Sequence, residues 1–181
     1  MEILDAIKER RSIRRFKQKS IGKDIIERII SYAAYAPSWK NSQTARYIAV
    51  LDPRVKDRLA NECLMNFQFN VNTVNSAPAV IALLTQNKRS GFERDGSFST
   101  GKGEHWQSFD AGIAAQTLCL AAHAHGLGTV IMGIYDEACV KEVLSVPEGF
   151  SVSALIAIGY PDEAPDAPPR KDSSTLLSYI D

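Results

Sequence analysis

The stretch Glu9-Arg-Arg-Ser-Ile-Arg-Arg-Phe16 places four arginines and one serine within eight residues. From Lys8 to Lys19 there are seven basic residues and one acidic residue, although the whole chain carries 21 Lys+Arg against 21 Asp+Glu. If the stretch is helical, Arg10 and Arg14 project from one face, and Ser12 can add its hydroxyl or its backbone N–H. A guanidinium fork binds two phosphate oxygens at once, so the stretch predicts an anion site. The alternative is a solvated basic helix end, where cations favour the negative end of the helix dipole.

The rest of the chain has the composition of an ordinary globular protein. Its 181 residues, 45% of them hydrophobic, suffice for a single domain over residues 1–181. No window approaches the ~18 consecutive apolar residues of a membrane span, and the acidic start Met1-Glu-Ile-Leu-Asp5 is unlike a signal peptide. We therefore expect a cytoplasmic protein with no membrane partner. Zero formal net charge argues against nucleic acid as a partner.

Cysteines and histidines give no sign of a metal site. The three cysteines, Cys63, Cys119 and Cys139, are odd in number and widely spaced, so we expect buried free thiols and neither a disulfide framework nor zinc. His123 and His125 are two residues apart on a predicted helix and therefore face different directions. No local motif suggests a catalytic triad, although triads are assembled in space and a sequence does not exclude one.

Hydrophobic spacing divides the chain into helices and strands. It predicts helices over residues 2–11, 24–36, 53–63, 106–125 and 136–144, and strands over 47–51, 79–84, 128–133 and 153–160. Asp52 with Pro53, and Asp136, are placed to begin helices, and Gly126 is placed to end one in a left-handed conformation. Neither a Rossmann fingerprint nor a Walker A motif is present.

Three segments suggest special roles. Residues 85–104 form a polar, glycine-containing stretch that we interpret as a candidate lid loop. The helix over 106–125 is apolar on nearly all sides, which predicts burial, and its small residues allow close approach by another helix in a domain centre or a symmetric dimer. Prolines keep the C-terminal arm, residues 161–181, extended, and residues 176–180 could be a short strand that needs an edge, conceivably on another chain.

A concentrated anion site without an obvious acid, base or nucleophile points to a bound phosphorylated cofactor as the reactive group. Several motifs then share one order along the chain. They are Arg10-Arg-Ser-Ile-Arg-Arg-Phe16, Ala36-Pro-Ser38 with Asn41-Ser-Gln43, Asp110-Ala-Gly-Ile-Ala-Ala-Gln116, Gly126-Leu-Gly-Thr129 and Arg170-Lys171. In these motifs the sequence resembles the FMN-dependent nitroreductase family over nearly its whole length.

This resemblance implies an α+β fold with a central mixed, mostly antiparallel sheet flanked by helices. It also implies an intimate homodimer with two FMN sites at the interface. The residues that it assigns to FMN binding are Arg10, Arg11, Ser12, Arg14, Pro37, Ser38, Trp39, Asn41, Asn70, Met132, Gly133, Arg170 and Lys171. The reactive centre would be flavin N5, so the resemblance names no catalytic side chain and no metal.

The same resemblance implies a division of labour. Arg10 and Arg170 would hold the phosphate, with Arg11 and Ser12 assisting, and Arg14 would reach the pyrimidine edge of the flavin. Residues 37–41 would come from the other subunit, and backbone N–H groups at Met132 and Gly133 would bind near N5. Two sequence departures matter: Thr44-Ala45 follows Gln43 where relatives commonly have Pro-Trp, and Asn70 matches a ribityl contact only approximately.

Two functional hypotheses follow from the resemblance. In the first, NAD(P)H, a diffusible donor, reduces the flavin, and a nitroaromatic, quinone or related small acceptor reoxidises it by a ping-pong mechanism. Trp39, Phe92 and Phe98 could line the acceptor pocket, or could be ordinary packing. In the second, the fold serves as a flavin-binding or sensing module with little turnover. A specialised enzyme, such as a reductive dehalogenase or a flavin-fragmenting enzyme, is a further alternative.

Overall fold

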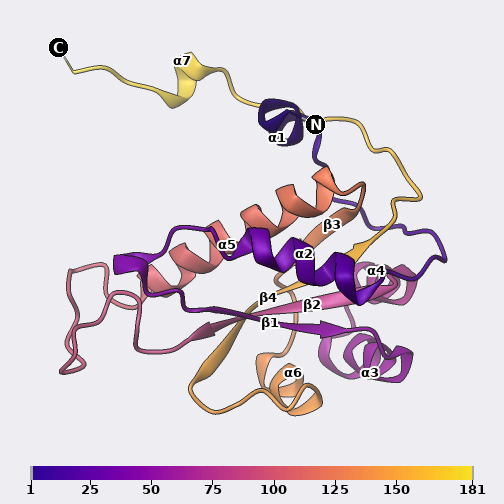
Figure 1. Cartoon of the computed structure of the whole chain (residues 1–181), viewed down its shortest axis with the longest axis horizontal. Coiled ribbons are helices and arrows are strands. Elements are labelled where there is room, and N and C mark those ends of the chain that lie inside the picture. Colours follow the sequence, from indigo (N-terminus) through magenta and orange to yellow (C-terminus); the bar gives the residue numbers. More distant parts are fainter. Residues whose placement is uncertain (1, 181) are drawn as a thin grey trace.

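The computed structural model describes residues 2–180 and has an α+β fold around one four-stranded sheet (Figure 1). The strands are β1 (Ala45–Val50), β2 (Ala79–Gln86), β3 (Gly128–Met132) and β4 (Phe150–Gly159), in the spatial order β1-β2-β4-β3. All three strand pairs are antiparallel, and the parallel component is an isolated bridge between Ser12 and Thr129. The predicted fold class is therefore confirmed.

Helices cover both faces of the sheet, as Figure 1 shows. One core lies between the sheet and α2 with α5, and the other between the sheet and the helices α3, η2, α4 and α6. The helices are α1 (Ile3–Glu9), α2 (Lys23–Ala33), η1 (Trp39–Asn41), α3 (Pro53–Arg58), η2 (Leu59–Cys63), α4 (Gln68–Ser76), α5 (His105–Ala124), α6 (Glu137–Val143) and α7 (Ser173–Leu176).

The apolar run at 79–84 becomes the central strand because successive side chains point to opposite faces. Ile81 and Leu83 pack with α2 and α5, whereas Val80, Ala82 and Leu84 pack in the opposite core. A strand covered on both faces needs apolar residues at every position, which explains why the run is continuous rather than alternating.

Local signals set several element boundaries as predicted. The Asp52 side chain accepts a hydrogen bond from the backbone N–H of Arg54 at 2.8 Å, with Pro53 at the first helical position of α3. Asp136 accepts from the N–H of Cys139 at 3.1 Å and begins α6 in the same way. Gly126 follows α5 with φ +76°, the left-handed conformation expected of a residue that ends a helix.

The prediction for the cysteines was wrong for two of the three. Cys63 and Cys139 form a disulfide with Cα atoms 5.3 Å apart, while Cys119 is a buried free thiol. The pair joins the end of η2 to α6, two elements that pack together under the sheet. A separation of 76 residues hides this contact from any local pattern.

The long helix α5 is not buried on all sides. Its buried side packs on α2 and the sheet, but Ser108, Phe109, Gly112 and Gln116 are exposed. Phe109 has 50% of its surface exposed. No polar stripe marks this face in the sequence, so the sequence predicts that the whole helix is buried. In the single chain, however, this face is exposed.

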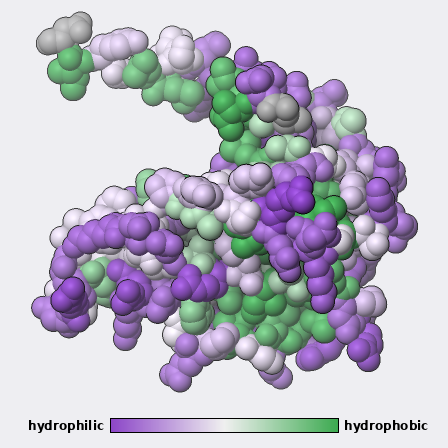
Figure 2. Space-filling view, in the orientation of Figure 1, coloured by the Kyte–Doolittle hydropathy of each residue, from purple (hydrophilic) through white to green (hydrophobic). Residues whose placement is uncertain are grey.

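The C-terminal arm leaves the body after β4 and ends far from the sheet (Figure 1). Figure 2 shows a hollow between the arm and the body. The strand predicted over 176–180 does not form within the chain: Ser173–Leu176 is a helical turn, and the described residues after it pair with no strand. No helix within residues 2–180 is long and apolar enough to cross a membrane.

Candidate functional site

The basic stretch 10–14 runs as an extended segment along the outer edge of β3. Helix α1 ends at Glu9, and Arg10 has φ −55° and ψ +130°, so the helical spacing assumed from the sequence was wrong. The backbone N–H of Ile13 donates to the carbonyl of Thr129 at 3.0 Å. The contacts of the two arginines differ, because Arg10 lies at a cavity beside His123 of α5 and the Arg14 guanidinium lies over Phe69 of α4.

A glycine permits this close approach. A Cβ atom on Gly128 would lie 2.6 Å from Cγ1 of Ile13, so any side chain at 128 would force the basic segment away from β3. The side chain of Ile13 is 6% exposed and belongs to the core beneath the sheet. Burial of Ile13 thus holds the basic segment against β3.

Three of the four arginines keep their charge free of carboxylates. Within residues 2–180, the side chains of Arg10, Arg11 and Arg14 form no ion pair. The Arg11 guanidinium donates to the carbonyls of Lys8 and Arg10, and the Arg14 guanidinium donates only to the carbonyl of Ser12, at 3.4 Å. Arg15, by contrast, pairs with Glu163 at 3.1 Å. The unpaired cations are therefore the ones that can bind an external anion.

Glu163, at the start of the arm, locks the backbone of this segment in place. Its carboxylate accepts hydrogen bonds from the backbone N–H groups of both Arg14 and Arg15 and from the Arg15 side chain. Partial burial opposes ionisation, but these donors outweigh it and hold the pKa of Glu163 below its ordinary value. The proline-rich arm gave no sequence signal for this contact.

Helix α4 forms a second wall beside Arg14. The Cζ atom of Arg14 lies 5.7 Å from the ring centroid of Phe69, and the Ser76 hydroxyl donates to the carbonyl of Arg14 at 3.1 Å. Asn70 is 9% exposed and donates to the carbonyl of Ile134 at 3.2 Å, which ties α4 to the segment after β3. The predicted residues 10–14, 70 and 132–133 thus lie in one region.

The edge of β3 beyond the Ser12 bridge has free backbone groups. Thr129 directs its carbonyl outward to Ile13, so by alternation Ile131 also directs its backbone groups outward, whereas Met132, the last residue of β3, pairs with Leu155 of β4. Ile131 is 47% exposed, Met132 is buried, and the space where a Cβ of Gly133 would stand is open. A planar ligand could approach Gly133 closely.

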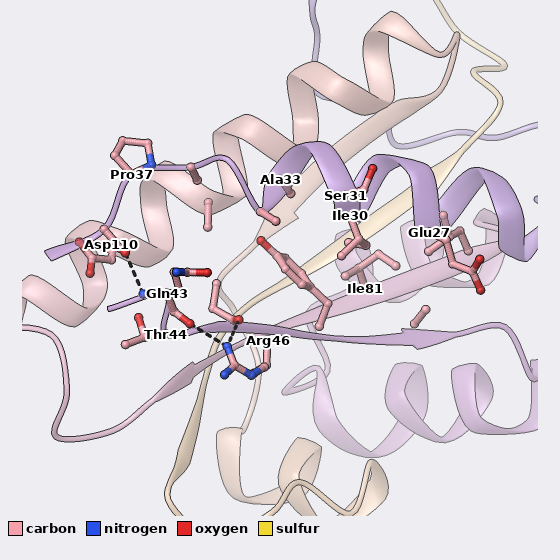
Figure 3. A pocket seen from close by; sticks show the side chains of 18 residues that line it. Glu27, Ile30, Ser31, Ala33, Pro37, Gln43, Thr44, Arg46, Ile81 and Asp110 are labelled. Atoms are coloured by element: carbon pink, nitrogen blue, oxygen red, sulfur yellow. Dashed lines mark hydrogen bonds between the residues drawn. The ribbon is translucent and has the colours of Figure 1, made fainter. Parts of the chain in front are cut away.

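The predicted loop 37–41 lies elsewhere in the chain. The backbone N–H of Trp39 donates to the buried carboxylate of Asp110 at 3.0 Å, and the rings of Trp39 and Trp106 are 4.6 Å apart (Figure 3 shows Asp110). These contacts place the loop at the N-terminal end of α5. A small cavity of about 270 Å³ joins Arg10 and Arg11 to His123, at the C-terminal end of the same helix. A helix of 20 residues is about 30 Å long, so one chain does not bring the two groups together.

The remaining predicted residues, Arg170 and Lys171, lie on the arm and are exposed. The Arg170 side chain donates only to the carbonyls of Pro168 and Pro169, at 3.3 and 3.4 Å. Among residues 2–180, neither side chain forms an ion pair or a hydrogen bond to the 10–14 segment.

Sequence reasoning did not predict a cavity between α2 and β1, which Figure 3 shows. It encloses about 590 Å³ and has mostly apolar walls that include Ile30, Ala34, Tyr47 and Ile81. Burial raises the pKa of the Tyr47 phenol to about 12, so this group is neutral at physiological pH. The apolar wall residues looked like ordinary core in the sequence, but Pro37 and Ser38, which were predicted to bind FMN, also line this cavity.

The family model described as "Nitroreductase family" matches residues 7–73 and 68–160. The chain belongs to the nitroreductase family. A Thermus thermophilus protein named NADH dehydrogenase is 29% identical over 178 residues, covering 86% of this chain and 84% of its own length. The crystal structure of a nitroreductase family protein from Clostridium novyi NT superposes with a TM-score of 0.78 at 30% identity, covering 92% of this chain and 90% of that one.

One similar nitroreductase-fold structure contains the cofactor that the resemblance implied. It is from Exiguobacterium sibiricum, is in complex with FMN, and has a TM-score of 0.84 at 23% identity, covering 99% of this chain and 98% of that chain. Among residues 2–180 of this nitroreductase-family chain, Arg10 and Arg14 lack carboxylate partners, and Gly133 leaves open space just after β3. This donor set fits a ligand that carries a phosphate and a planar polar ring.

Proposed function

We propose that the chain is an FMN-dependent oxidoreductase that takes reducing equivalents from NAD(P)H and passes them to a small acceptor, such as a nitroaromatic or a quinone, in alternating half-reactions. The observation that carries the proposal is the group of unpaired arginines in the segment 10–14, set beside the free edge of β3. When bound, FMN supplies the centre that accepts and donates the electrons.

The side chains of the chain itself bind and orient. Arg10 and Ser12 hold the phosphate and ribityl end, and Arg14 reaches the pyrimidine edge, where a fixed cation favours negative charge on the reduced ring. Asn70, held by its hydrogen bond to the carbonyl of Ile134, contributes a side-chain oxygen. The N–H of Gly133 donates at the other edge of the ring.

The other half of the site comes from a second copy of the chain. Because loop 37–41 and Arg10 lie at opposite ends of α5, two chains with antiparallel α5 helices would each bring that loop to the basic segment of the other. The exposed face of α5, with Phe109 and Gly112, is suited to this close packing. We infer that dimerisation and FMN binding are coupled.

The arm and the cavity under α2 support the same assembly. Leu176, Leu177 and Ile180 are exposed by 70%, 52% and 101%, an apolar surface that a single chain leaves unburied. The cavity runs along β1, an edge strand whose outer backbone groups face no other strand of residues 2–180. In our proposal, residues 176–180 of the partner's arm form the predicted strand and pair with the outer edge of β1.

The test is flavin binding and its dependence on Arg14. The purified protein is expected to be yellow or to bind added FMN with a raised melting temperature, and NAD(P)H is expected to bleach the bound flavin within seconds. Arg14→Ala should weaken FMN binding roughly 10-fold, about 1.4 kcal/mol, with the fold intact. Arg15→Ala is the matched control, because Arg15 is already paired with Glu163 and 74% exposed.

Three outcomes discriminate between the alternatives. Protein that neither contains nor binds FMN would contradict the proposal. Flavin that binds but is reduced and reoxidised only over minutes would favour a sensing module. Equal FMN affinity in the Arg14→Ala and Arg15→Ala variants would mean that Arg14 merely solvates the segment.

A further inference from the structure

Three aromatic rings meet at the N-terminal end of α5. The Trp39 and Trp106 rings are 4.6 Å apart, and the Trp106 and Phe109 rings are 5.4 Å apart and nearly perpendicular. Trp106 is fixed by donating its indole N–H to the Thr100 hydroxyl at 2.9 Å, and the backbone of Trp39 is held by Asp110. These two hydrogen bonds hold the tryptophans in place. Phe109 is half exposed, so the cluster has an open aromatic surface.

Two lysines lie over these rings, and only one of them pairs with a carboxylate. The Lys102 ammonium is 4.7 Å from the ring centroids of both Trp106 and Phe109. Lys40 lies 5.6 Å from the Trp39 ring but pairs with Glu93 at 2.9 Å. Among the residues that the structure describes, the Lys102 side chain has no carboxylate partner.

Two other carboxylates of this region, Asp95 and Glu93, have partners of their own, whereas the exposed Glu104 has no side-chain partner among the described residues. Asp95 accepts from the backbone and hydroxyl of Ser97, at 3.0 and 2.6 Å. The Glu93 hydrogen bonds lower its pKa, so it stays ionised and continues to neutralise Lys40. Of the two lysines that lie over the rings, Lys102 is thus the one without a carboxylate partner among the described residues, and it stands just before the first turn of α5, where the helix dipole also favours an anion.

The alternative is that Lys102 only covers aromatic surface. A cation over a ring contributes about 0.5–1 kcal/mol at an exposed site, which is enough to account for the side-chain position. Covering aromatic surface requires neither an unpaired Lys102 ammonium nor an exposed Phe109 ring. Binding of an aromatic anion would use both the ammonium and the ring. The ring of such a ligand would pack on Phe109 and Trp106 while its anionic group paired with Lys102.

We propose that the cluster of Trp39, Trp106, Phe109 and Lys102 is the acceptor subsite and selects aromatic acceptors that carry an anionic substituent, such as a carboxylate. This inference rests on the proposed function, in which loop 37–41 lies over the cofactor bound by the partner. For a nitro acceptor, two electrons from NAD(P)H and two protons convert the nitro group to a nitroso group and water. Lys102 takes no part in that step and only positions the anion.

The test compares two acceptors of nearly equal shape, 4-nitrobenzoate and 4-nitrobenzamide, with FMN-saturated protein. Wild-type kcat/KM is expected to favour the carboxylate. Lys102→Met should lower the carboxylate-to-amide ratio at least fivefold, and Lys102→Glu at least 20-fold, mostly through KM, by the loss and then reversal of one charge. The rate of flavin reduction by NAD(P)H should stay within twofold. Lys88→Met, an exposed lysine of the same loop, is the matched control and should leave the ratio unchanged.

A binding measurement separates this inference from the proposed function. Isothermal titration of each ligand into the FMN-saturated protein should show tighter binding of 4-nitrobenzoate, and this preference should disappear in Lys102→Met. Equal binding of the two ligands, or an unchanged preference in Lys102→Met, would overturn the inference even if NAD(P)H oxidation is fast. Selective binding without any NAD(P)H oxidation would support the anion site and contradict the proposed oxidoreductase instead.

Discussion

At the residue scale, the arginines show what local spacing predicts and what it does not. The spacing of Arg10 and Arg14 suggests one face of a helix, but α1 ends at Glu9 and Arg10 is already extended. The sequence does not show which of these arginines pairs with a carboxylate. Arg15 is neutralised by Glu163, which lies 148 residues away, and no local pattern distinguishes Arg15 from Arg14.

Glu163 gives a prediction in pH. Its pKa is lowered in the folded state, so its stabilising contribution is present above the unfolded pKa of about 4.3 and is lost as pH falls through the folded pKa. Glu163→Gln should lower the free energy of unfolding at pH 7 by about 1–3 kcal/mol, through weaker acceptance from Arg14 and Arg15. The difference from wild type should shrink steadily below pH 4.

Urea unfolding at several pH values between 3 and 7 measures this difference. Glu148→Gln is the control, because Glu148 is exposed and its side chain makes no hydrogen bond or ion pair among the described residues. A Glu163→Gln effect of the same size at pH 3 and pH 7 would show that packing, and not the ionised carboxylate, stabilises the segment.

At the element scale, periodicity and capping located most helices and strands, but not which faces meet. Asp52, Asp136 and Gly126 act within one turn of their own position, so their roles could be predicted. The pairing of Cys63 with Cys139 and the exposed face of α5 depend on elements far apart in the chain. The fold class was therefore accessible from the sequence, and the separation of loop 37–41 from the basic segment was not.

The disulfide gives a prediction at this scale. It closes a 76-residue separation between η2 and α6, and such crosslinks typically contribute about 2–4 kcal/mol. Reduction should therefore lower the melting temperature by roughly 5–15 °C for a chain of this size. Thiol titration in denaturant should detect one cysteine, Cys119, before reduction and all three afterwards.

The control for the reductant is the double variant Cys63→Ser with Cys139→Ser, whose melting temperature should not respond to it. Three reactive thiols in denatured, unreduced protein would contradict the disulfide. An unchanged melting temperature after complete reduction would mean that the packing of η2 on α6 alone holds these elements.

At the scale of the whole molecule, the main surfaces left open are the ones that a second copy would cover. The exposed α5 face, the apolar end of the arm and the cavity beside β1 belong to three different elements. Figure 2 shows how the arm stands off from the body. In the dimer that we propose, these surfaces are buried, and the site is divided so that each site joins opposite ends of the two α5 helices.

Gly112 tests this division, because the single chain and the dimer predict opposite effects of one change. In an isolated chain a Cβ at 112 meets nothing within 4 Å, so Gly112→Glu should stabilise the exposed helix by up to about 1 kcal/mol. In a dimer with α5 packed on its copy, the same change places two like charges at a close contact. We expect Gly112→Glu to convert a species of twice 19.9 kDa into a monomer and to release FMN.

Light scattering after gel filtration, with flavin absorbance recorded on the same column, measures both consequences. Asn75→Glu adds the same charge to an exposed position of α4 and should leave the dimer and its flavin intact. A Gly112→Glu protein that stays dimeric and keeps its flavin would show that α5 is not the interface. A monomer that still binds FMN as tightly as wild type would show that the basic segment and the β3 edge suffice, and that loop 37–41 of a partner contributes nothing to cofactor affinity.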